Sequence, residues 1–372
     1  MTLPVYVCSI AKNEAKHVRR WYESAKDADG IFMLDTGSED DTVAIARELG
    51  ITVFEKTYDK WSFAAARNDL REMLPDHDAW LISLDLDEVL IPGWRSHWKD
   101  IPDDVNRLRY RYIWNWRADG SPNVEYSGDK IVRRYSHRWV NKVHEVNAPQ
   151  DGVIEKQHFL PDFEIHHHAD NSKPRSSYLP LLLEDLEDNP HNDRNTYYCA
   201  RELFFYGRFE EAITLFKRHL TMPESVWAPE RAWSMRYLAK MLPEEAEQWH
   251  LRACAEYPQG AEVWTDLANH YYGKQKWAGM YYAAKRALEC QHYTRLYLTE
   301  PDAYGWWPHD MVALSAHNIH ADYDAFMHGY VAAKLNPDDA RLQKNLEFYK
   351  ENVKEYALHT YEAIAKTMVP RA

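Results

Sequence analysis

The chain has 372 residues, of which 45% are hydrophobic and 28% are charged, a composition typical of a soluble protein with a buried core. Its net charge of −13 gives no general attraction to a phosphate backbone or to an anionic membrane, which disfavours nucleic acid and lipid surfaces as partners. The sequence contains no apolar stretch near the ~18 residues that span a bilayer, and its N-terminus lacks the basic start and cleavage site of a signal peptide. We therefore expect a cytoplasmic protein without a membrane partner.

Residues 1–110 alternate β-branched apolar runs with amphipathic ones, which predicts strands and helices in turn. The predicted strands cover residues 4–10, 30–35, 51–56 and 79–87, and the predicted helices cover residues 15–28, 42–50 and 61–74. Ser38 is placed to cap the second of these helices. Such alternation is typical of a parallel sheet covered on both faces, whose ligands bind beyond the carboxyl ends of the strands. Residues 12–14, Asp35 and residues 85–88 follow strand ends, so we expect them to share one crevice.

The pattern changes after this region. Residues 107–116 and 129–146 predict further strands that extend the sheet in a mixed arrangement, and the polar residues 166–177, around Pro174, indicate a linker. Everything beyond is predicted to be helical, and small residues recur there every 34 positions, as in the pairs Ala212 with Ala246 and Ser234 with Ala268. Thirty-four residues is the period of tetratricopeptide repeats.

A further repeat around Ala313 fits this period only after a shift of three residues, and a plain helical bundle is the alternative interpretation. The predicted organisation is an α/β domain over residues 1–170, a linker with a first helix over residues 171–195, and a tetratricopeptide-like helical domain over residues 196–372.

The segment LDLDE places Asp85, Asp87 and Glu88 close together where the fourth predicted strand leaves the core. Neighbouring carboxylates repel one another, so each tends to keep a proton unless a cation lies between them. Oxygen ligands of this kind suit Mg²⁺ or Mn²⁺, and such a metal commonly neutralises a departing diphosphate. Two solvated loop acids are the alternative, because Asp-x-Asp by itself is a weak signal.

Four segments occur in order and together carry a resemblance: SIAKNE, LDTGSEDDTVAIARELG, FAAARND and LISLDLDE. Over about residues 3–170 the chain resembles family-2 type glycosyltransferases with a GT-A fold, a nucleotide-diphospho-sugar transferase fold with a Rossmann-like mixed sheet. The helical region resembles the tetratricopeptide-like repeats attached to a subset of these enzymes, including peptide S-glycosyltransferases and phage-encoded relatives. A Rossmann dehydrogenase is disfavoured because no GxGxxG follows the first strand.

The resemblance implies how a nucleotide-sugar donor would bind. Asp35 would hydrogen-bond the base or ribose, Arg67 would contact the nucleotide or its phosphates with Asn68 beside it, and the base pocket would also be lined by Asn13 and Glu14. Structural alternatives are an Arg67 that pairs with a surface acid and an Asp35 that caps the following helix. Arg133 and Arg134 either clamp phosphate or flank a strand.

The resemblance also implies a metal site and a catalytic base. Asp85 would lie near the ribose and the metal, Asp87 would be the direct ligand of Mn²⁺ or Mg²⁺, and His166 or His168 would complete the coordination. The segment WVNKVHEV resembles the family's Trp-x-x-x-Val-His-Glu stretch, which makes Glu145 the expected base and His144 a residue that positions the acceptor or the diphosphate. The family's base is often an acidic pair, whereas here it would be His-Glu. The alternatives are an exposed strand acid at Glu145 and a hinge of solvated histidines.

The expected function is therefore that of a metal-dependent, inverting glycosyltransferase that takes a sugar from a nucleotide-sugar, with a UDP-sugar as the expected donor. A protein or peptide is the expected acceptor, because tetratricopeptide arrays commonly grip extended peptides. DNA, as in phage base hypermodification, is an alternative that the charge of −13 disfavours. A non-catalytic helical-repeat scaffold and a nucleotidyltransferase are two competing interpretations of the whole chain, and a homodimer is a further expectation.

Overall fold

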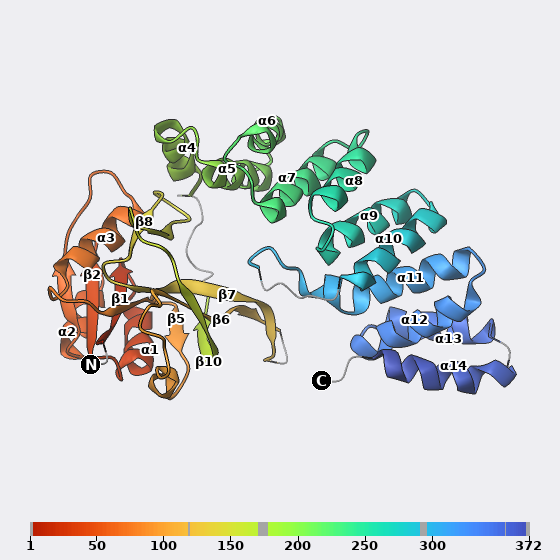
Figure 1. Cartoon of the computed structure of the whole chain (residues 1–372), viewed down its shortest axis with the longest axis horizontal. Helices are drawn as coiled ribbons and strands as arrows, with labels where there is room; N and C mark the ends of the chain where they lie inside the picture. The colour runs from red at the N-terminus through yellow and green to blue at the C-terminus, as the bar shows by residue number, and fades with distance from the viewer. Residues whose placement is uncertain (1–2, 118–119, 170–177, 291–295, 354, 370–372) are drawn as a thin grey trace. The chain divides into compact units, whose positions relative to one another are not determined.

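The computed structural model describes residues 3–117, 120–169, 178–290, 296–353 and 355–369 (Figure 1). Its contacts divide it into two compact units. The first unit contains the described residues up to Glu202 together with Leu296 and Tyr297, and the second contains those from Leu203 to Cys290 and from Leu298 onward. The predicted linker falls largely on residues 170–177, including Pro174, which lie outside the described residues.

Eight strands of the first unit form one sheet in the order β3-β2-β1-β4-β7-β6-β10-β5. The parallel part consists of β1 (Val5–Ala11), β2 (Gly30–Asp35), β3 (Thr52–Glu55) and β4 (Trp80–Ser83). The mixed part consists of β5 (Glu88–Leu90), β6 (Arg107–Trp116), β7 (Pro122–Arg133) and β10 (Gln157–His167). The prediction of a parallel sheet with a mixed extension is thereby confirmed.

Alternation along the central strands sends side chains to two different cores. Val5, Val7 and Ile82 pack on one face with α1 (Ala15–Ala25) and α2 (Thr42–Glu48). Tyr6 and Cys8 pack on the opposite face with α3 (Phe63–Met73). Helices therefore cover both faces, as the strand and helix alternation predicts.

Three local predictions need correction. The strand predicted over residues 79–87 ends at Ser83, because the following carboxylates form a turn that leads into β5. The strand predicted over residues 129–146 is three strands, since β7 ends at Arg133 and a separate two-stranded sheet pairs β8 (His137–Val140) with β9 (Val146–Pro149). Ser38 does not cap α2: the residue before that helix is Asp41, and the Ser38 hydroxyl instead donates to Asp35.

Two more helices follow the sheet, α4 (Tyr178–Asp188) and α5 (Asp193–Phe205). Asp185 in α4 accepts a hydrogen bond from the backbone N–H of Lys142, and the Lys142 ammonium pairs with Glu184 and Asp188. These contacts tie α4 to the loop between β8 and β9, which carries Glu145.

The second unit is a succession of helices that pack against their neighbours in the chain. They are α6 (Phe209–Thr221), α7 (Ala228–Met241), α8 (Ala246–Glu256), α9 (Ala261–Gly273), α10 (Trp277–Glu289), α11 (Trp306–Asn318), α12 (Asp322–Leu335), α13 (Ala340–Glu351) and α14 (Glu355–Met368). Fully buried alanines such as Ala268, Ala283 and Ala284 allow adjacent helices to approach closely. The predicted fold class, an α/β domain followed by an all-α repeat domain, is confirmed.

The spacing of the repeats departs from the prediction at one point. Between the end of α10 and the start of α11, the chain adds residues that include the 3-10 turn η3 (Pro301–Tyr304). The insertion is longer than the predicted shift of three residues, and its turn η3 packs against α9 and α11.

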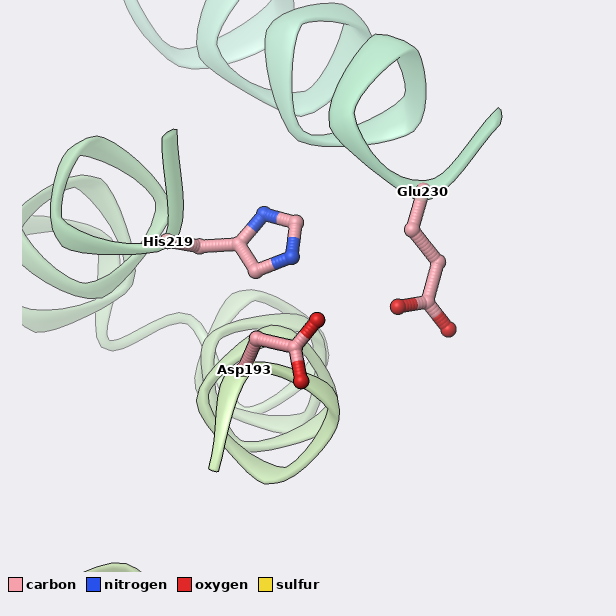
Figure 2. A group of neighbouring side chains, drawn as sticks. All are labelled: Asp193, His219 and Glu230. Atoms are coloured by element: carbon pink, nitrogen blue, oxygen red, sulfur yellow. The ribbon is translucent and has the colours of Figure 1, made fainter. Parts of the chain in front are cut away.

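Some buried polar groups of the second unit form hydrogen bonds with side chains of the same unit. His219, near the end of α6, and Glu230, in the first turn of α7, are both buried (Figure 2). The two ring nitrogens of His219 lie 3.0 Å from the Ser225 hydroxyl and 2.9 Å from the Ser234 hydroxyl. Among the described residues, no helix has the length and apolar character needed to cross a membrane.

Candidate functional site

Arg67 joins two of the carboxylates that the sequence singles out. It lies on α3, is 8% exposed, and packs over the Trp139 ring. Its Nε donates to Glu145 Oε1 at 2.8 Å and its Nη2 donates to Asp85 Oδ1 at 2.7 Å. A single guanidinium thus bridges the turn after β4 and the loop between β8 and β9.

A second cation, whose side chain is 26% exposed, lies on the other side of Asp85. Lys130, on β7, donates from Nζ to Asp85 Oδ2 and to Glu88 Oε1, both at 2.7 Å. Glu88, which is 1% exposed, also accepts a hydrogen bond from the Tyr112 hydroxyl and, through Oε2, from the Asp85 backbone N–H. Glu88 belongs to the carboxylate cluster that the sequence singles out, whereas Lys130 and Tyr112 are site residues that the sequence prediction does not include.

These contacts shift the pKa values of Asp85 and Glu88 in opposite directions. Burial alone would raise the pKa of Asp85, but Arg67 and Lys130 outweigh it and hold that pKa far below its usual value. Burial and the nearby Asp85 charge raise the pKa of Glu88. The predicted need for a metal between neighbouring acids is therefore met at Asp85 by two protein cations.

Asp87 has a different environment. Its Oδ2 lies 3.4 Å from His167 Nε2, and its backbone carbonyl accepts a hydrogen bond from the His168 N–H at 2.8 Å. The other ring nitrogen of His167 lies 2.9 Å from the Trp114 carbonyl, and the ring stacks on the Trp114 indole at 4.4 Å. Burial lowers the pKa of His167, but the bonds to Asp87 and to the Trp114 carbonyl raise it by a larger amount. The net shift of this pKa is therefore upward.

The histidines predicted to complete a metal site lie on either side of His167. His166 Nε2 lies 2.7 Å from Glu164 Oε2, and its ring meets the Trp116 ring edge-on. The His168 ring stacks against Trp116 at 6.4 Å. Of the three consecutive imidazoles, the structure brings that of His167 to the Asp87 carboxylate.

The residues predicted to bind the nucleotide base lie in two loops that are joined by hydrogen bonds. Asp35, which is 3% exposed, accepts hydrogen bonds through Oδ2 from the N–H groups of Gly37 and Ser38 at 3.0 and 2.9 Å. Asn13 has a positive φ of 57°, receives the Glu39 N–H on its side-chain oxygen, and donates its own N–H to the Ser38 hydroxyl. The Glu14 N–H donates to Thr42 Oγ1 at 2.7 Å. These bonds bring the ends of β1 and β2 together.

Glu145 and His144 lie in the loop after β8. The Glu145 side chain is 13% exposed, so it is not the exposed strand acid of the alternative interpretation. His144 has a positive φ of 49° and stacks on Tyr198 of α5 with ring centroids 4.0 Å apart. Burial and the charges of Arg201 and Arg194 lower the pKa of His144 to about 3, so its ring is neutral near pH 7.

Three other predicted residues use their side chains to hold the fold. Asn68 donates to the Trp139 carbonyl at 2.9 Å and accepts from the Trp139 N–H at 3.0 Å, which fixes β8 to α3. Arg133 pairs with Asp78, and Arg134 donates to the carbonyls of residues 74, 75 and 77. Because β7 runs antiparallel to β4, with residue 133 opposite residue 80, both arginines lie at the end of β4 remote from Asp85 and flank the strand.

The donor set at Asp87 fits a divalent cation of the manganese type. The Asp87 side chain is 29% exposed, and its neighbour within 4 Å among the described cationic side chains is the His167 imidazole. A carboxylate oxygen is a ligand that suits Mn²⁺ and Mg²⁺, and an imidazole nitrogen is a common ligand of first-row divalent metals. A small cavity between α3 and the sheet is lined by Ser9, Arg67 and Ser83, and neither Asp87 nor His167 is among its lining residues.

Residues 6–97 match the family described as glycosyl transferase family 2, a segment that runs from β1 through the 3-10 turn η1 (Trp94–His97). The resemblance read from the sequence is confirmed for this domain. An uncharacterised glycosyltransferase of Rickettsia felis is 30% identical over 152 residues, which cover 39% of this chain and 52% of the relative. The chain thus spans about half the length of the curated relatives it matches.

Two solved structures are similar in part. One is glucosyl-3-phosphoglycerate synthase from Mycobacterium tuberculosis in complex with Mn²⁺, UDP and glucosyl-3-phosphoglycerate, with 15% identity and a TM-score of 0.32 over 48% of this chain and 76% of that one. The second is a thermophilic tetratricopeptide-repeat protein of Thermus thermophilus, with 16% identity and a TM-score of 0.31 over 46% of this chain and 88% of that one.

Proposed function

We propose that the protein is a metal-dependent glycosyltransferase that moves a sugar from a nucleotide-sugar, with a UDP-sugar as the donor, to an acceptor with inversion at the anomeric carbon. The observation that carries the proposal is the bridge from Arg67 to Asp85 and Glu145. It fixes a candidate base relative to the strand end where a family 2 domain would hold its donor.

Glu145 is proposed as the base. Arg67 donates to Oε1 of Glu145, and no described residue donates a hydrogen bond to Oε2. The second oxygen can therefore take the proton of an acceptor hydroxyl, amine or thiol as that group attacks the sugar. His144, neutral near pH 7, stands next to it in the chain and is proposed to position the acceptor.

Asp87 and His167 are proposed to hold Mn²⁺ or Mg²⁺, and Asp85 is proposed to orient the ribose side of the donor. When bound, the metal would neutralise charge on the departing diphosphate. Arg67 contributes fixed positive charge to the same end of β4, and its own position is secured by two carboxylates. His168, whose N–H contacts the Asp87 carbonyl, stays a prediction as an additional imidazole ligand.

A protein or peptide is proposed as the acceptor. A run of paired helices offers a long surface of the kind that repeat proteins use for binding. The net charge of −13 disfavours DNA, which would have to approach against repulsion.

The test is donor binding. The wild-type protein would be mixed with a panel of UDP- and GDP-sugars with and without Mn²⁺, and thermal stabilisation and sugar release would be measured. The Asp87→Asn variant removes the proposed ligand, and Asp162→Asn removes an exposed carboxylate elsewhere on the sheet. We expect manganese-dependent stabilisation by one nucleotide class in the wild type and in Asp162→Asn, and its loss in Asp87→Asn. Failure of every donor to bind in the presence of metal would contradict the proposal.

A further inference from the structure

Arg236 forms the centre of a buried polar site in the helical unit. It lies on α7, is 3% exposed, and packs 4.2 Å over the Trp233 ring. Its Nε donates to Asp266 of α9 at 2.6 Å, and its Nη2 donates to both carboxylate oxygens of Glu300 at 2.9 and 3.1 Å. The guanidinium is thus held on one side by a helix and on the other by the insertion between α10 and α11.

The insertion is bound through its backbone as well as through Glu300. The Glu300 N–H donates to Glu262 Oε1 at 3.1 Å, and the Tyr304 hydroxyl donates to Glu262 Oε2 at 3.1 Å. The same hydroxyl accepts the Ala261 N–H at 3.3 Å. Leu298 and Ala303 of the same segment are buried. Residues 298–304 therefore contact α7 and α9 through three kinds of group. The Glu300 carboxylate binds Arg236, and the Glu300 N–H and the Tyr304 hydroxyl bind Glu262. A bound peptide would use the same kinds of contact.

The match between the site and Glu300 is incomplete. Nη1 of Arg236 is buried and has no hydrogen-bond partner among the described residues. Such an unsatisfied buried donor is costly, and native structures contain few of them. Glu300 itself is 42% exposed, although the guanidinium that it contacts is almost fully buried. Both oxygens of Glu300 accept from the same nitrogen, Nη2. A carboxylate that accepted one hydrogen bond from each of two guanidinium nitrogens would match the planar shape of the guanidinium better.

We propose that Arg236, Asp266 and Glu262 form a binding site for an extended acidic peptide of a partner protein, and that the chain fills this site in cis with residues 298–304. The site lies wholly in the helical unit and does not depend on the proposed transferase activity. The partner segment would carry a glutamate or aspartate for Arg236 and a hydroxyl-bearing side chain for Glu262.

The charges explain why the two peptides would exclude one another. Asp266 and Glu300 together already exceed the single positive charge of Arg236, so a third carboxylate would be repelled unless Glu300 left. Burial raises the pKa of Glu262, which lessens its repulsion of an incoming acid. Partner binding should therefore displace the insertion instead of adding to it.

A labelled peptide with the sequence of residues 298–304 serves as the probe, and its binding to the full-length chain is measured by fluorescence anisotropy. In the wild type the tethered segment competes with the probe. In Glu300→Gln the competitor is weakened, and the probe should bind at least about tenfold more tightly, the gain expected when the tethered segment occupies the site for more than about nine-tenths of the time. Asp302→Asn removes the same charge from an exposed position of the same segment, so it should bind the probe like the wild type.

Two further measurements keep the outcome clear. A probe peptide with glutamine in place of the glutamate at position 300 should bind to neither protein, because Arg236 recognises the carboxylate. Amide exchange of residues 298–304 in the wild type should become faster when the glutamate probe is added in excess. The proposal is overturned if Glu300→Gln, shown to be folded by circular dichroism, gains no affinity, or if the glutamine probe binds equally well.

Discussion

Arg67 Nε lies 2.8 Å from Glu145 Oε1, although 78 residues separate the two in the chain. The same guanidinium reaches Asp85 at 2.7 Å, so one buried cation couples the proposed base to the strand end proposed to hold the donor. The contact gives Arg67 a role in both positioning and charge balance.

Replacement of Arg67 by lysine should test that role. Lysine keeps the positive charge, but it lacks the planar guanidinium whose separate nitrogens donate to Glu145 and to Asp85. We expect Arg67→Lys to lower kcat/KM for the sugar donor by about 10²-fold, the typical cost of losing one oriented donor in an active site. Arg71→Lys, one turn further along α3, is the matched control, because lysine can still donate to the His137 carbonyl that Arg71 contacts. Equal activity of Arg67→Lys and the wild type would show that the bridge is not needed.

Glu145→Gln should separate chemistry from binding. Glutamine has the same shape but cannot accept the proton of the acceptor, so kcat should fall by about 10²- to 10⁴-fold. The dissociation constant of the donor, measured by titration calorimetry, should stay near the wild-type value. Glu72→Gln, at an exposed position of α3, should change neither quantity. A Glu145→Gln protein that transfers sugar at the normal rate would assign the base to another residue.

Asn68→Ala should affect stability. The side chain makes two hydrogen bonds with the backbone of Trp139, and their loss leaves buried partners unsatisfied. We expect the free energy of unfolding, measured with urea, to fall by about 1–3 kcal/mol. Asn318→Ala, which removes an exposed hydrogen bond within α11, should have a smaller effect. Normal stability combined with weaker nucleotide binding would instead support the sequence-based prediction that Asn68 lies beside the nucleotide.

The helical unit should lose stability in mild acid. Burial is the largest cause that lowers the pKa values of four histidines, to about 4 for His219, His250 and His309 and to about 3 for His328. The usual histidine pKa is about 6.5, so between about pH 6.5 and 4 the unfolded chain binds more protons than the folded one. Stability therefore falls as the pH falls through this window, by up to about 1.4 kcal/mol per pH unit for each histidine.

Thermal unfolding followed by circular dichroism from pH 7 to pH 5 would measure this loss. His328→Gln should weaken the pH dependence, whereas His320→Asn, at an exposed position of positive φ that asparagine tolerates, should leave it unchanged. An unfolding midpoint that rose on acidification would refute the assignment of these histidines as neutral and buried.

The sequence predicts β1 to β4 and β6 because these strands are local runs rich in apolar or aromatic residues, whereas β5 and β10 fall outside the predicted strands. Lys130 could not be found in this way, because its contacts with Asp85 and Glu88 depend on the antiparallel pairing of β7 with β4, 45 and 42 residues away. The same is true of the Arg67 bridge to Glu145, which requires the loop after β8 to fold back on α3.

His167 could have been found from the sequence. Phe163 and Ile165 are buried at alternate positions of β10, and His167 continues that alternation toward the core. The prediction groups His166 with His168 on the opposite face, and the apolar residues at 163 and 165 indicate which face of the strand turns inward. At Asp85, the sequence predicts a divalent metal, and it cannot show that Arg67 and Lys130 supply positive charge there, because both lie far away in the chain.

The central claim is that Asp87 and His167 hold a divalent metal against a nucleotide diphosphate at the end of β4. A crystal of the protein grown with Mn²⁺ and UDP, with data collected to record anomalous scattering from manganese, tests it most directly. The account predicts one strong manganese peak about 2.0–2.3 Å from an Asp87 carboxylate oxygen, with the diphosphate among its other ligands. Bound UDP without a manganese peak at Asp87, or a peak elsewhere in the molecule, would contradict it.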